Sequence, residues 1–263
     1  MENNTETKER IGADGQGSSV TGEAERSVTE AKQPAPAGQT VRKAVSYGLG
    51  LVMIAIGINA TKLAQIGISP TSSFPRAVEA VTGMTLGTAT TLVCVLLVFV
   101  QAAILRKRFK LINIIGVPIS IVFGWIVDIF GTDPKAFGHL MAGVPRPETY
   151  PMKLLYYVVG ILILSMGVYL YSRVNWVLMP TDGVGWAFAE VTGKNFGDCK
   201  SVVDCGLVLC ALILQLVFLG GLKSFTENVV VREGTVVAAV AVGQLIKLWH
   251  KLFDKKTDKT NES

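Results

Sequence analysis

The polar side chains with the clearest chemistry follow a Pro180-Thr181 step and begin the apolar stretch after it. Asp182 comes directly after Thr181, where a new helix would start, and Lys200 precedes Asp204 by one helical turn. In an apolar setting, Asp182 fits the binding of a cation, a proton or an amine. It also fits a helix N-cap, and Lys200 with Asp204 also fits a structural ion pair.

Thr71, Ser72 and Ser73 follow a similar step at Pro70. Backbone N–H groups at the start of a helix bind anionic or polar groups, and hydroxyl side chains add donors there. Both steps therefore contribute to one candidate substrate-binding set, with these members: Thr71, Ser72, Ser73, Thr181, Asp182, Asp204 and Lys200.

The sequence contains no Walker A, HExxH, GxSxG or GxGxxG pattern. No nucleophile–base pair or metal-ligand set is visible either. The four cysteines form no CxxC pair and no Cys/His cluster, which is typical of apolar packing residues: Cys94, Cys199, Cys205 and Cys210. We therefore expect no enzyme activity, no metal and no cofactor.

The composition points to a lipid bilayer as the partner of this chain. Half of the 263 residues are hydrophobic, only 17% are charged, and the apolar residues come in blocks. Charge-free stretches cover 44–61, 80–105, 111–127, 154–172 and 205–222. These lengths match the roughly 20 residues of a membrane-crossing helix, and a soluble domain of this size could not bury five of them. The net charge of +5 lies at block ends, so it does not indicate nucleic-acid binding.

One pattern occurs twice, at an offset of 110 residues. Gly57 recurs as Gly167, Pro70-Thr71 as Pro180-Thr181, and Val81-Thr82-Gly83 as Val191-Thr192-Gly193. Each copy reads as an apolar span, a Pro break, a short helix and a second apolar span. Pro70, Pro180, Gly83 and Gly193 are expected to be structural breaks. The pattern predicts an internal duplication.

The predicted fold is an all-α polytopic membrane protein with six transmembrane helices. Three spans per copy is an odd number, so the two three-helix repeats would be inverted, each with a Pro-broken short helix. The predicted spans are 45–66, 86–105, 111–130, 154–171, 201–219 and 235–249. The predicted organisation is a disordered cytoplasmic tail (1–40), a first membrane repeat (45–130), a connecting loop (131–153), a second membrane repeat (154–250) and a lysine-rich polar tail (251–263).

Lysine and arginine counts predict the orientation. An excess falls on the side that carries Arg42 and Lys43, the loop after residue 105 and the C-terminal lysines. Cytoplasmic loops carry such an excess. We therefore expect a multi-pass protein of the cytoplasmic membrane with both termini in the cytoplasm. Other charges have simpler roles: Lys62 would snorkel, and Arg76 would neutralise Glu79 one turn later.

At the two breaks the chain resembles the YitT/YczE group of bacterial integral membrane proteins over about residues 45–250. That group carries an acidic residue after the first break, where this chain has Ser72 and Ser73. The resemblance implies a multi-spanning bacterial membrane protein and little chemistry. It rests on these features: the Gly57-to-Pro70 spacing, Thr82-Gly83 with Gly87, the Gly124–Asp128 segment, and Pro180-Thr181-Asp182 where that group often has Pro-Gly-Asp.

Two functional hypotheses follow. The first is a small-molecule or ion secondary transporter or permease whose site lies between the two broken helices, because matched breaks form substrate sites in such folds. The second is a non-transporting membrane accessory or scaffold protein that acts through a partner. A homo-oligomer or a membrane partner fits either hypothesis.

Overall fold

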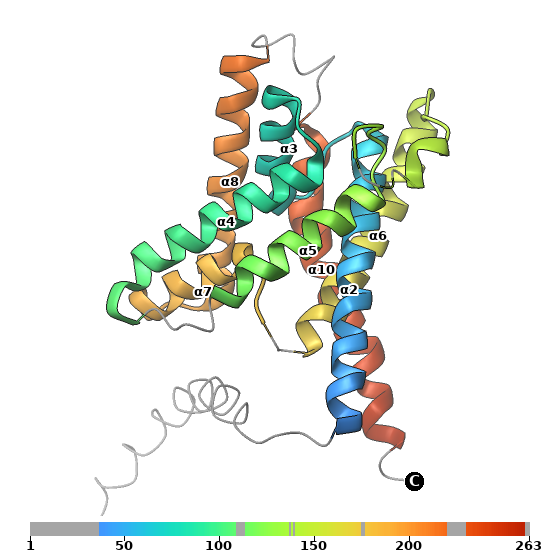
Figure 1. Ribbon diagram of the computed structural model, residues 1–263. Helices are drawn as coiled ribbons and strands as arrows, with labels where there is room; N and C mark the ends of the chain where they lie inside the picture. Colours follow the sequence, from blue (N-terminus) through green and yellow to red (C-terminus); the bar gives the residue numbers. More distant parts are fainter. Residues whose placement is uncertain are drawn as a thin grey trace, which may run out of the picture. The chain divides into compact units, whose positions relative to one another are not determined.

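The computed structural model describes residues 37–108, 114–136, 138, 140–174, 177–219 and 230–260. The chain divides into two units, Met1–Lys43 and Ala44–Ser263, and the second contains the packed helices (Figure 1). Every regular element in the described residues is helical. In chain order they are α2 (Ala37–Ala64), α3 (Pro70–Thr82), α4 (Leu86–Leu105), η2 (Arg106–Arg108), α5 (Gly116–Ile129), η4 (Leu140–Gly143), α6 (Tyr150–Val174), α7 (Pro180–Thr192), α8 (Phe196–Phe218) and α10 (Glu233–Thr260).

Five helices in the described part of the chain are long and apolar enough to cross a membrane: α2, α4, α6, α8 and α10. The chain is thus an all-helical, membrane-type protein, as its composition predicts. The remaining predicted span corresponds to α5, which has 14 residues and a length of about 21 Å. The start of that predicted span, 111–113, lies outside the described residues.

Helices α2 and α6 cross in direct backbone contact. A Cβ atom added to Gly50 would lie 2.9 Å from the carbonyl oxygen of Gly167, and one added to Gly57 would lie 2.8 Å from that of Gly160. Residue numbers rise along one helix as they fall along the other, so the two helices are antiparallel. At the 110-residue offset Gly50 corresponds to Gly160, and Gly57 corresponds to Gly167. Each glycine of α2 therefore contacts the counterpart of the other one. Around the crossing lies a core cluster that includes Leu51, Ile54 and Leu164.

The two short helices match in length and in the residues at their ends. Helices α3 and α7 each have 13 residues, start with the proline of their break, and end at a glycine in the left-handed region. The φ angles are 70° at Gly83 and 68° at Gly193, a conformation that favours glycine. In both helices the last threonine donates to the carbonyl four residues earlier. The predicted breaks at Pro70, Pro180, Gly83 and Gly193 are therefore real helix ends.

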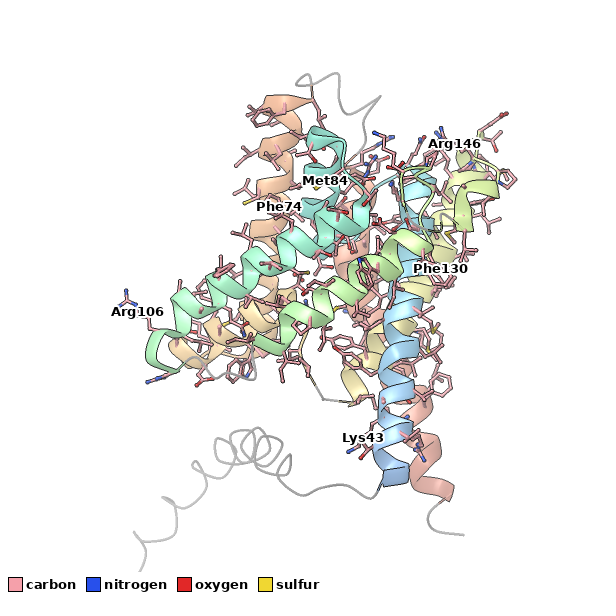
Figure 2. The ribbon with its side chains drawn as sticks, viewed as in Figure 1. Lys43, Phe74, Met84, Arg106, Phe130 and Arg146 are labelled. Carbon is pink, nitrogen blue, oxygen red and sulfur yellow. The ribbon has the colours of Figure 1, made fainter. Side chains whose placement is uncertain are left out.

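Each short helix packs mainly against long helices of both halves. Helix α3 lies along α8 and α4, and α7 lies along α4 and α8. A core cluster joins α4, α7 and α8 through Val93, Leu97, Val184, Val203 and Leu207, and Phe74 and Val78 of α3 pack onto it. Figure 2 places Phe74 and Met84 near one end of α4 and Arg106 at the other. The short helices thus lie toward opposite ends of α4.

Contacts between side chains fix the helix directions. Helices α4 and α5 are antiparallel, because Gly87 meets Gly124 near the start of one and the end of the other. Helices α6 and α10 are parallel, because Tyr157 bonds to Gly234 and Ser165 to Trp249. In Figure 1, α2, α5 and α8 run one way along the bundle, while α4, α6 and α10 run the other.

Helices extend into both predicted tails. Residues 1–36 of the predicted disordered tail lie outside the described part of the chain, but 37–40 belong to α2. At the other end α10 continues to Thr260, so the helix includes most of the predicted polar tail 251–263.

The α2–α6 crossing gives a first prediction. Gly57→Ala adds a methyl group 2.6 Å from Leu164 Cβ and against the α6 backbone, so the helices must separate. We expect a loss of about 1–2 kcal/mol in stability, seen as a lower unfolding temperature of the protein in detergent. Gly48→Ala is the matched control, because its methyl group would meet nothing within 4 Å. Equal unfolding temperatures for the two variants would contradict the close crossing.

Candidate functional site

The second break carries a cluster of charged side chains, here called the Asp182 cluster: Tyr171, Asp182, Lys200 and Asp204. The ammonium nitrogen Nζ of Lys200 lies 2.5 Å from Oδ1 of Asp182 and 3.5 Å from Oδ2 of Asp204. The Tyr171 hydroxyl donates to Oδ2 of Asp182. The Lys200 ammonium group thus lies between two carboxylates, and the Tyr171 hydroxyl donates to the second oxygen of Asp182.

Three helices bring this cluster together. Tyr171 lies in the last turn of α6, Asp182 in the first turn of α7, and Lys200 one turn before Asp204 in α8. The approach of α7 to α8 depends on Gly185, where an added Cβ would lie 3.1 Å from Lys200 Cα. The N-cap of α7 is Met179, which makes no side-chain cap. The N-cap interpretation of Asp182 is therefore wrong, because its carboxylate is held by Lys200 and Tyr171.

The cluster has two acidic groups and one basic group. All three charged side chains are at most 30% exposed. Oδ1 of Asp204 is buried and has no hydrogen-bond partner among the described residues. A buried acceptor without a donor is costly, so this oxygen is suited to receive a proton, an ammonium group or a water molecule. The predicted pairing of Lys200 with Asp204 exists, but the shorter contact of Lys200 is with Asp182.

The hydroxyl groups of the first break are used locally. Ser73 donates to the carbonyl of Pro70 at 2.6 Å and is fully buried, and Ser69 donates to the Ser72 hydroxyl at 3.0 Å. Thr71 lies 3.3 Å from the same Ser69 hydroxyl. Thr181, at the second break, is half-buried. The predicted set thus divides: Asp182, Lys200 and Asp204 come together, while Thr71, Ser72 and Ser73 make contacts within the first turn of α3.

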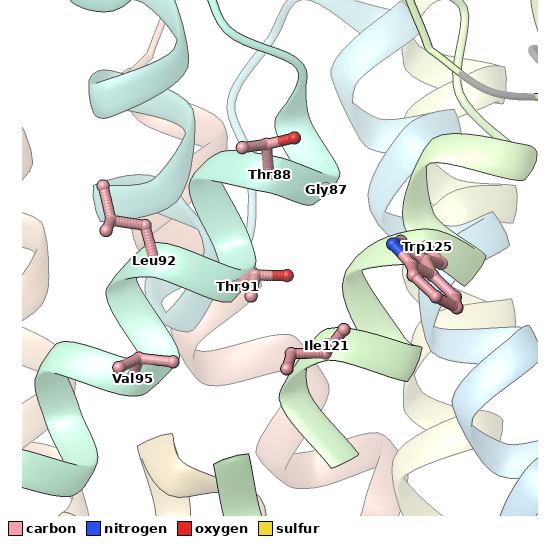
Figure 3. A pocket seen from close by; sticks show the side chains of 7 residues that line it. All are labelled: Gly87, Thr88, Thr91, Leu92, Val95, Ile121 and Trp125. Carbon is pink, nitrogen blue, oxygen red and sulfur yellow. The ribbon is translucent and has the colours of Figure 1, made fainter. Parts of the chain in front are cut away.

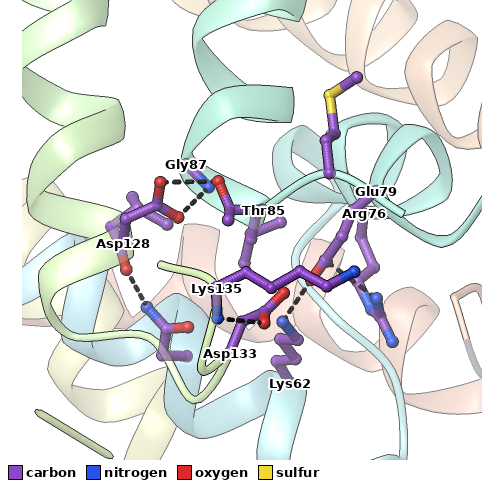
Figure 4. A network of polar contacts seen from close by, with 12 residues as sticks. Lys62, Arg76, Glu79, Thr85, Gly87, Asp128, Asp133 and Lys135 are labelled. Atoms are coloured by element: carbon purple, nitrogen blue, oxygen red, sulfur yellow. Dashed lines mark hydrogen bonds and ion pairs between the residues drawn. The ribbon is translucent and has the colours of Figure 1, made fainter. Parts of the chain in front are cut away.

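A second charged cluster lies beside the first break, here called the Glu79 cluster: Lys62, Arg76 and Glu79 (Figure 4). Glu79 on α3 accepts from Lys62 of α2 at 2.5 Å and from Arg76 at 2.8 Å. The Arg76–Glu79 pair was predicted from its spacing. Lys62 was expected to snorkel, but it binds Glu79 instead, because α3 folds back against the end of α2. A separation of 17 residues gives no signal for such a contact in the sequence.

Asp128 at the end of α5 caps α4 (Figure 4). Its Oδ2 accepts from the Thr85 hydroxyl and its Oδ1 from the Gly87 N–H, both at 2.7 Å. These donors lie at the N-terminus of α4, where an anion is favoured by the helix dipole. Nearby, Asn59 of α2 donates to the Val127 carbonyl at 2.9 Å. Asp128 therefore fastens α5 to α4, a structural role.

The two breaks do not share one network of contacts. The Glu79 cluster lies at the end of α2 and the Asp182 cluster at the end of α6, and these helices are antiparallel. Between them the short helices meet the apolar cluster of Val93, Leu97, Val184, Val203 and Leu207. The site expected between Pro70 and Pro180 is accordingly two polar clusters separated by an apolar layer.

Two apolar grooves flank α5. One, of about 320 Å³, runs between α4 and α5 past Gly87, Thr91 and Trp125 (Figure 3). The other, of about 340 Å³, runs between α2 and α5 past Tyr47, Leu51 and Ile126. Trp125 is 67% exposed, and other apolar side chains of these helices, such as Phe99, are exposed as well. Such surfaces suit a lipid environment, and neither groove includes a residue of the two charged clusters.

The helical part of the chain is similar to known proteins. The model of a family of unknown function, DUF6198, matches residues 41–251, which include all of α3 to α8 and most of α2 and α10. The chain is also similar to the uncharacterized protein YyaS of Bacillus subtilis (strain 168), with 20% identity over 173 residues, 66% of this chain and 81% of that protein. No solved structure matches the chain.

The Asp182 cluster gives a second prediction. Lys200→Met leaves two carboxylates close together without their cation, and we expect a loss on the order of 1–2 kcal/mol after allowance for partial exposure. The additional change Asp204→Asn removes one negative charge and should recover part of that loss. Unfolding temperatures in detergent measure both effects.

Lys194→Met, at an exposed position just before α8, serves as the control and should leave the unfolding temperature unchanged. If the double variant were as unstable as Lys200→Met alone, charge repulsion between Asp182 and Asp204 would not be the cause.

Proposed function

We propose, given that this chain belongs to the DUF6198 family of unknown function, that it is a secondary transporter or permease for a small molecule or ion. The observation that carries the proposal is the Asp182 cluster. It sets Asp182 of the short helix α7 beside Lys200 and Asp204 of α8, a helix of membrane-crossing length. Ionisable residues within membrane-spanning helices are costly, and they commonly mark substrate, ion or proton pathways.

The chemistry of the cluster favours a positively charged or protonated ligand. Asp182 and Asp204 together outweigh Lys200 by one negative charge, and Oδ1 of Asp204 is buried without a donor. A proton, an alkali cation or a substituted ammonium group would complete this arrangement. Lys200 already supplies one such ammonium group, so a ligand cation would compete with it for the same two carboxylates.

We infer six membrane passages in two inverted repeats. The support is the alternation of helix directions, in which α2, α5 and α8 oppose α4, α6 and α10, with α5 as the short sixth passage. The corresponding helices α2 and α6 are antiparallel and meet through equivalent glycines. Inverted repeats with a matched pair of broken helices are a common plan of secondary transporters.

We also infer kinship with the YitT/YczE group and residence in the cytoplasmic membrane with both termini in the cytoplasm. The first inference is supported by the Pro-Thr breaks and the glycine spacing of both repeats. The second is supported by the excess of lysine and arginine, which includes Arg106 and Arg108 at the end of α4. In this orientation the Asp182 cluster lies toward the cytoplasm and the Glu79 cluster toward the outside.

A non-transporting accessory or scaffold protein is the second candidate. It is favoured by the first break, where Ser69, Ser72 and Ser73 use their hydroxyls within the turn. Under this alternative both breaks are packed folds of the chain, and a stable protein partner co-purifies with it.

A flux measurement tests the transport proposal. We expect purified protein in liposomes loaded with the pH dye pyranine to change the internal pH when Na⁺, K⁺ or methylammonium is added outside. Asp182→Asn and Asp204→Asn should reduce that flux by at least about tenfold, because each removes a charge that the ligand needs. Thr181→Ala, beside Asp182, measures how far the flux depends on the hydroxyl group at the second break.

The matched control is Asp198→Asn, which makes the same chemical change at an exposed position of α8. It should retain the wild-type flux. Flux no greater than in empty liposomes with all three cations, together with a co-purifying partner, would favour the accessory role. Flux that is equal in Asp182→Asn, Asp204→Asn and wild type would count against this site.

A further inference from the structure

Each short helix carries one acidic side chain that ties it to a neighbouring long helix. On α3, Glu79 is 7% exposed and bonds to Lys62 at the end of α2. On α7, Asp182 is 14% exposed and bonds to Lys200 of α8 and to Tyr171 at the end of α6. In both cases the contact is short and the carboxylate is largely withdrawn from solvent.

The two contacts lie at opposite ends of the helix bundle. Lys62 is near the last residue of α2, and Tyr171 is near the last residue of α6. Because α2 and α6 are antiparallel at their glycine crossing, the ends of these helices point in opposite directions. In a membrane, one contact therefore faces each side.

Both short helices have open space around their C-terminal ends. Each helix ends at a glycine, Gly83 or Gly193, around which an added Cβ would meet nothing within 4 Å. Each is then joined to its long helix by a short linker that ends at Thr85 or Asn195. Their inner surfaces rest on the apolar cluster of Val93, Leu97, Val184, Val203 and Leu207, which separates the two polar ends.

We propose that α3 and α7 are the two gates of the protein and that Glu79 and Asp182 are their latches, each holding one end closed. Opening at the first end separates Glu79 from Lys62, and opening at the second separates Asp182 from Lys200 and Tyr171. This inference rests on the proposed transport function, and it adds the moving parts and the contacts that must break.

In each contact one of the two charged groups has a second partner on its own helix, which lowers the cost of opening. Arg76 lies one turn from Glu79 on α3, at 2.8 Å, and it moves with Glu79 when Lys62 is released. Asp204 lies one turn from Lys200 on α8, at 3.5 Å, and it keeps Lys200 paired when Asp182 is released. Breaking a buried ion pair is expensive because it leaves uncompensated charges. Here Glu79 and Lys200 retain a partner, so opening leaves only Lys62 or Asp182 to face the opened space.

Two buried alanines report the state of the gates. Ala77 of α3 and Ala187 of α7 correspond at the 110-residue offset, and both are fully buried. We would introduce Ala77→Cys or Ala187→Cys singly, after replacing the four native cysteines with alanine. The protein would be placed in lipid nanodiscs without substrate, where both faces are open to a water-soluble maleimide. The labelling rate then measures how often each gate opens.

Glu79→Gln should raise the labelling rate at the Ala77 reporter by at least about fivefold and leave the Ala187 reporter unchanged. Asp182→Asn should do the reverse. Tyr171→Phe, which removes one hydroxyl and leaves no lone charge, should also raise labelling at the Ala187 reporter alone. Lys62→Met, which leaves Glu79 paired with Arg76, should raise labelling at the Ala77 reporter alone. These milder variants keep the test valid if a carboxylate variant fails to fold.

Glu190→Gln is the control, because Glu190 lies on α7 and forms no ion pair among the described residues. It should change neither rate. Equal acceleration at both reporters, which would reflect general loosening, overturns the proposal, and so does the absence of any change. The labelling requires no substrate, so gate-specific labelling without cation flux would retain the latches and reject transport. Flux that depends on Asp182 without gate-specific labelling would do the opposite.

Discussion

The close crossing of α2 and α6 determines how the rest of the molecule is arranged. Lipid gives helices little hydrophobic reason to associate, so membrane helices hold together where small residues let their backbones approach. Gly50, Gly57, Gly160 and Gly167 provide such a contact, and it is antiparallel. That direction puts the end of α2 and the end of α6 at opposite ends of the bundle. The first short helix must then start at one end and the second at the other, which separates the Glu79 and Asp182 clusters.

A second constraint acts on the charged side chains: the free-energy cost of holding ionised groups away from water. Three of the carboxylates are held by donors from a neighbouring helix: Glu79 by Lys62, Asp128 by Thr85 and Gly87, and Asp182 by Lys200 and Tyr171. Asp128 of α5 accepts hydrogen bonds at the N-terminus of α4, and these two long helices pack along each other. Its role is therefore structural. Glu79 and Asp182 instead lie on short helices that follow a Pro break and end at glycine. The same type of side chain is thus structural on α5 and suited to a moving part on α3 and α7.

Local backbone chemistry explains what the sequence predicted well. Proline starts a helix and glycine in the left-handed region ends one, so Pro70, Pro180, Gly83 and Gly193 marked the ends of α3 and α7 within the sequence itself. The spacing of Lys200 and Asp204 likewise identified an intrahelical pair. Contacts made by chain reversal left no such signal, and Lys62–Glu79, Tyr171–Asp182 and Thr85–Asp128 were missed for that reason.

The two short helices are alike in length and in their ends, but their charges differ. Ser72 occupies the place in α3 that Asp182 has in α7, and Ala189 occupies the place of Glu79. The acidic side chain of α3 therefore lies two turns further along its helix than that of α7, and it binds the end of the preceding long helix through a lysine instead of a tyrosine. Helices that are equivalent in shape consequently meet different electrostatic costs when they move. Under the proposed gating, the free energies for opening the two ends differ, and the resting population of each open state follows from that difference. Under that proposal, a scaffold with matched helices and different latches would have a preferred resting side without any difference between its short helices.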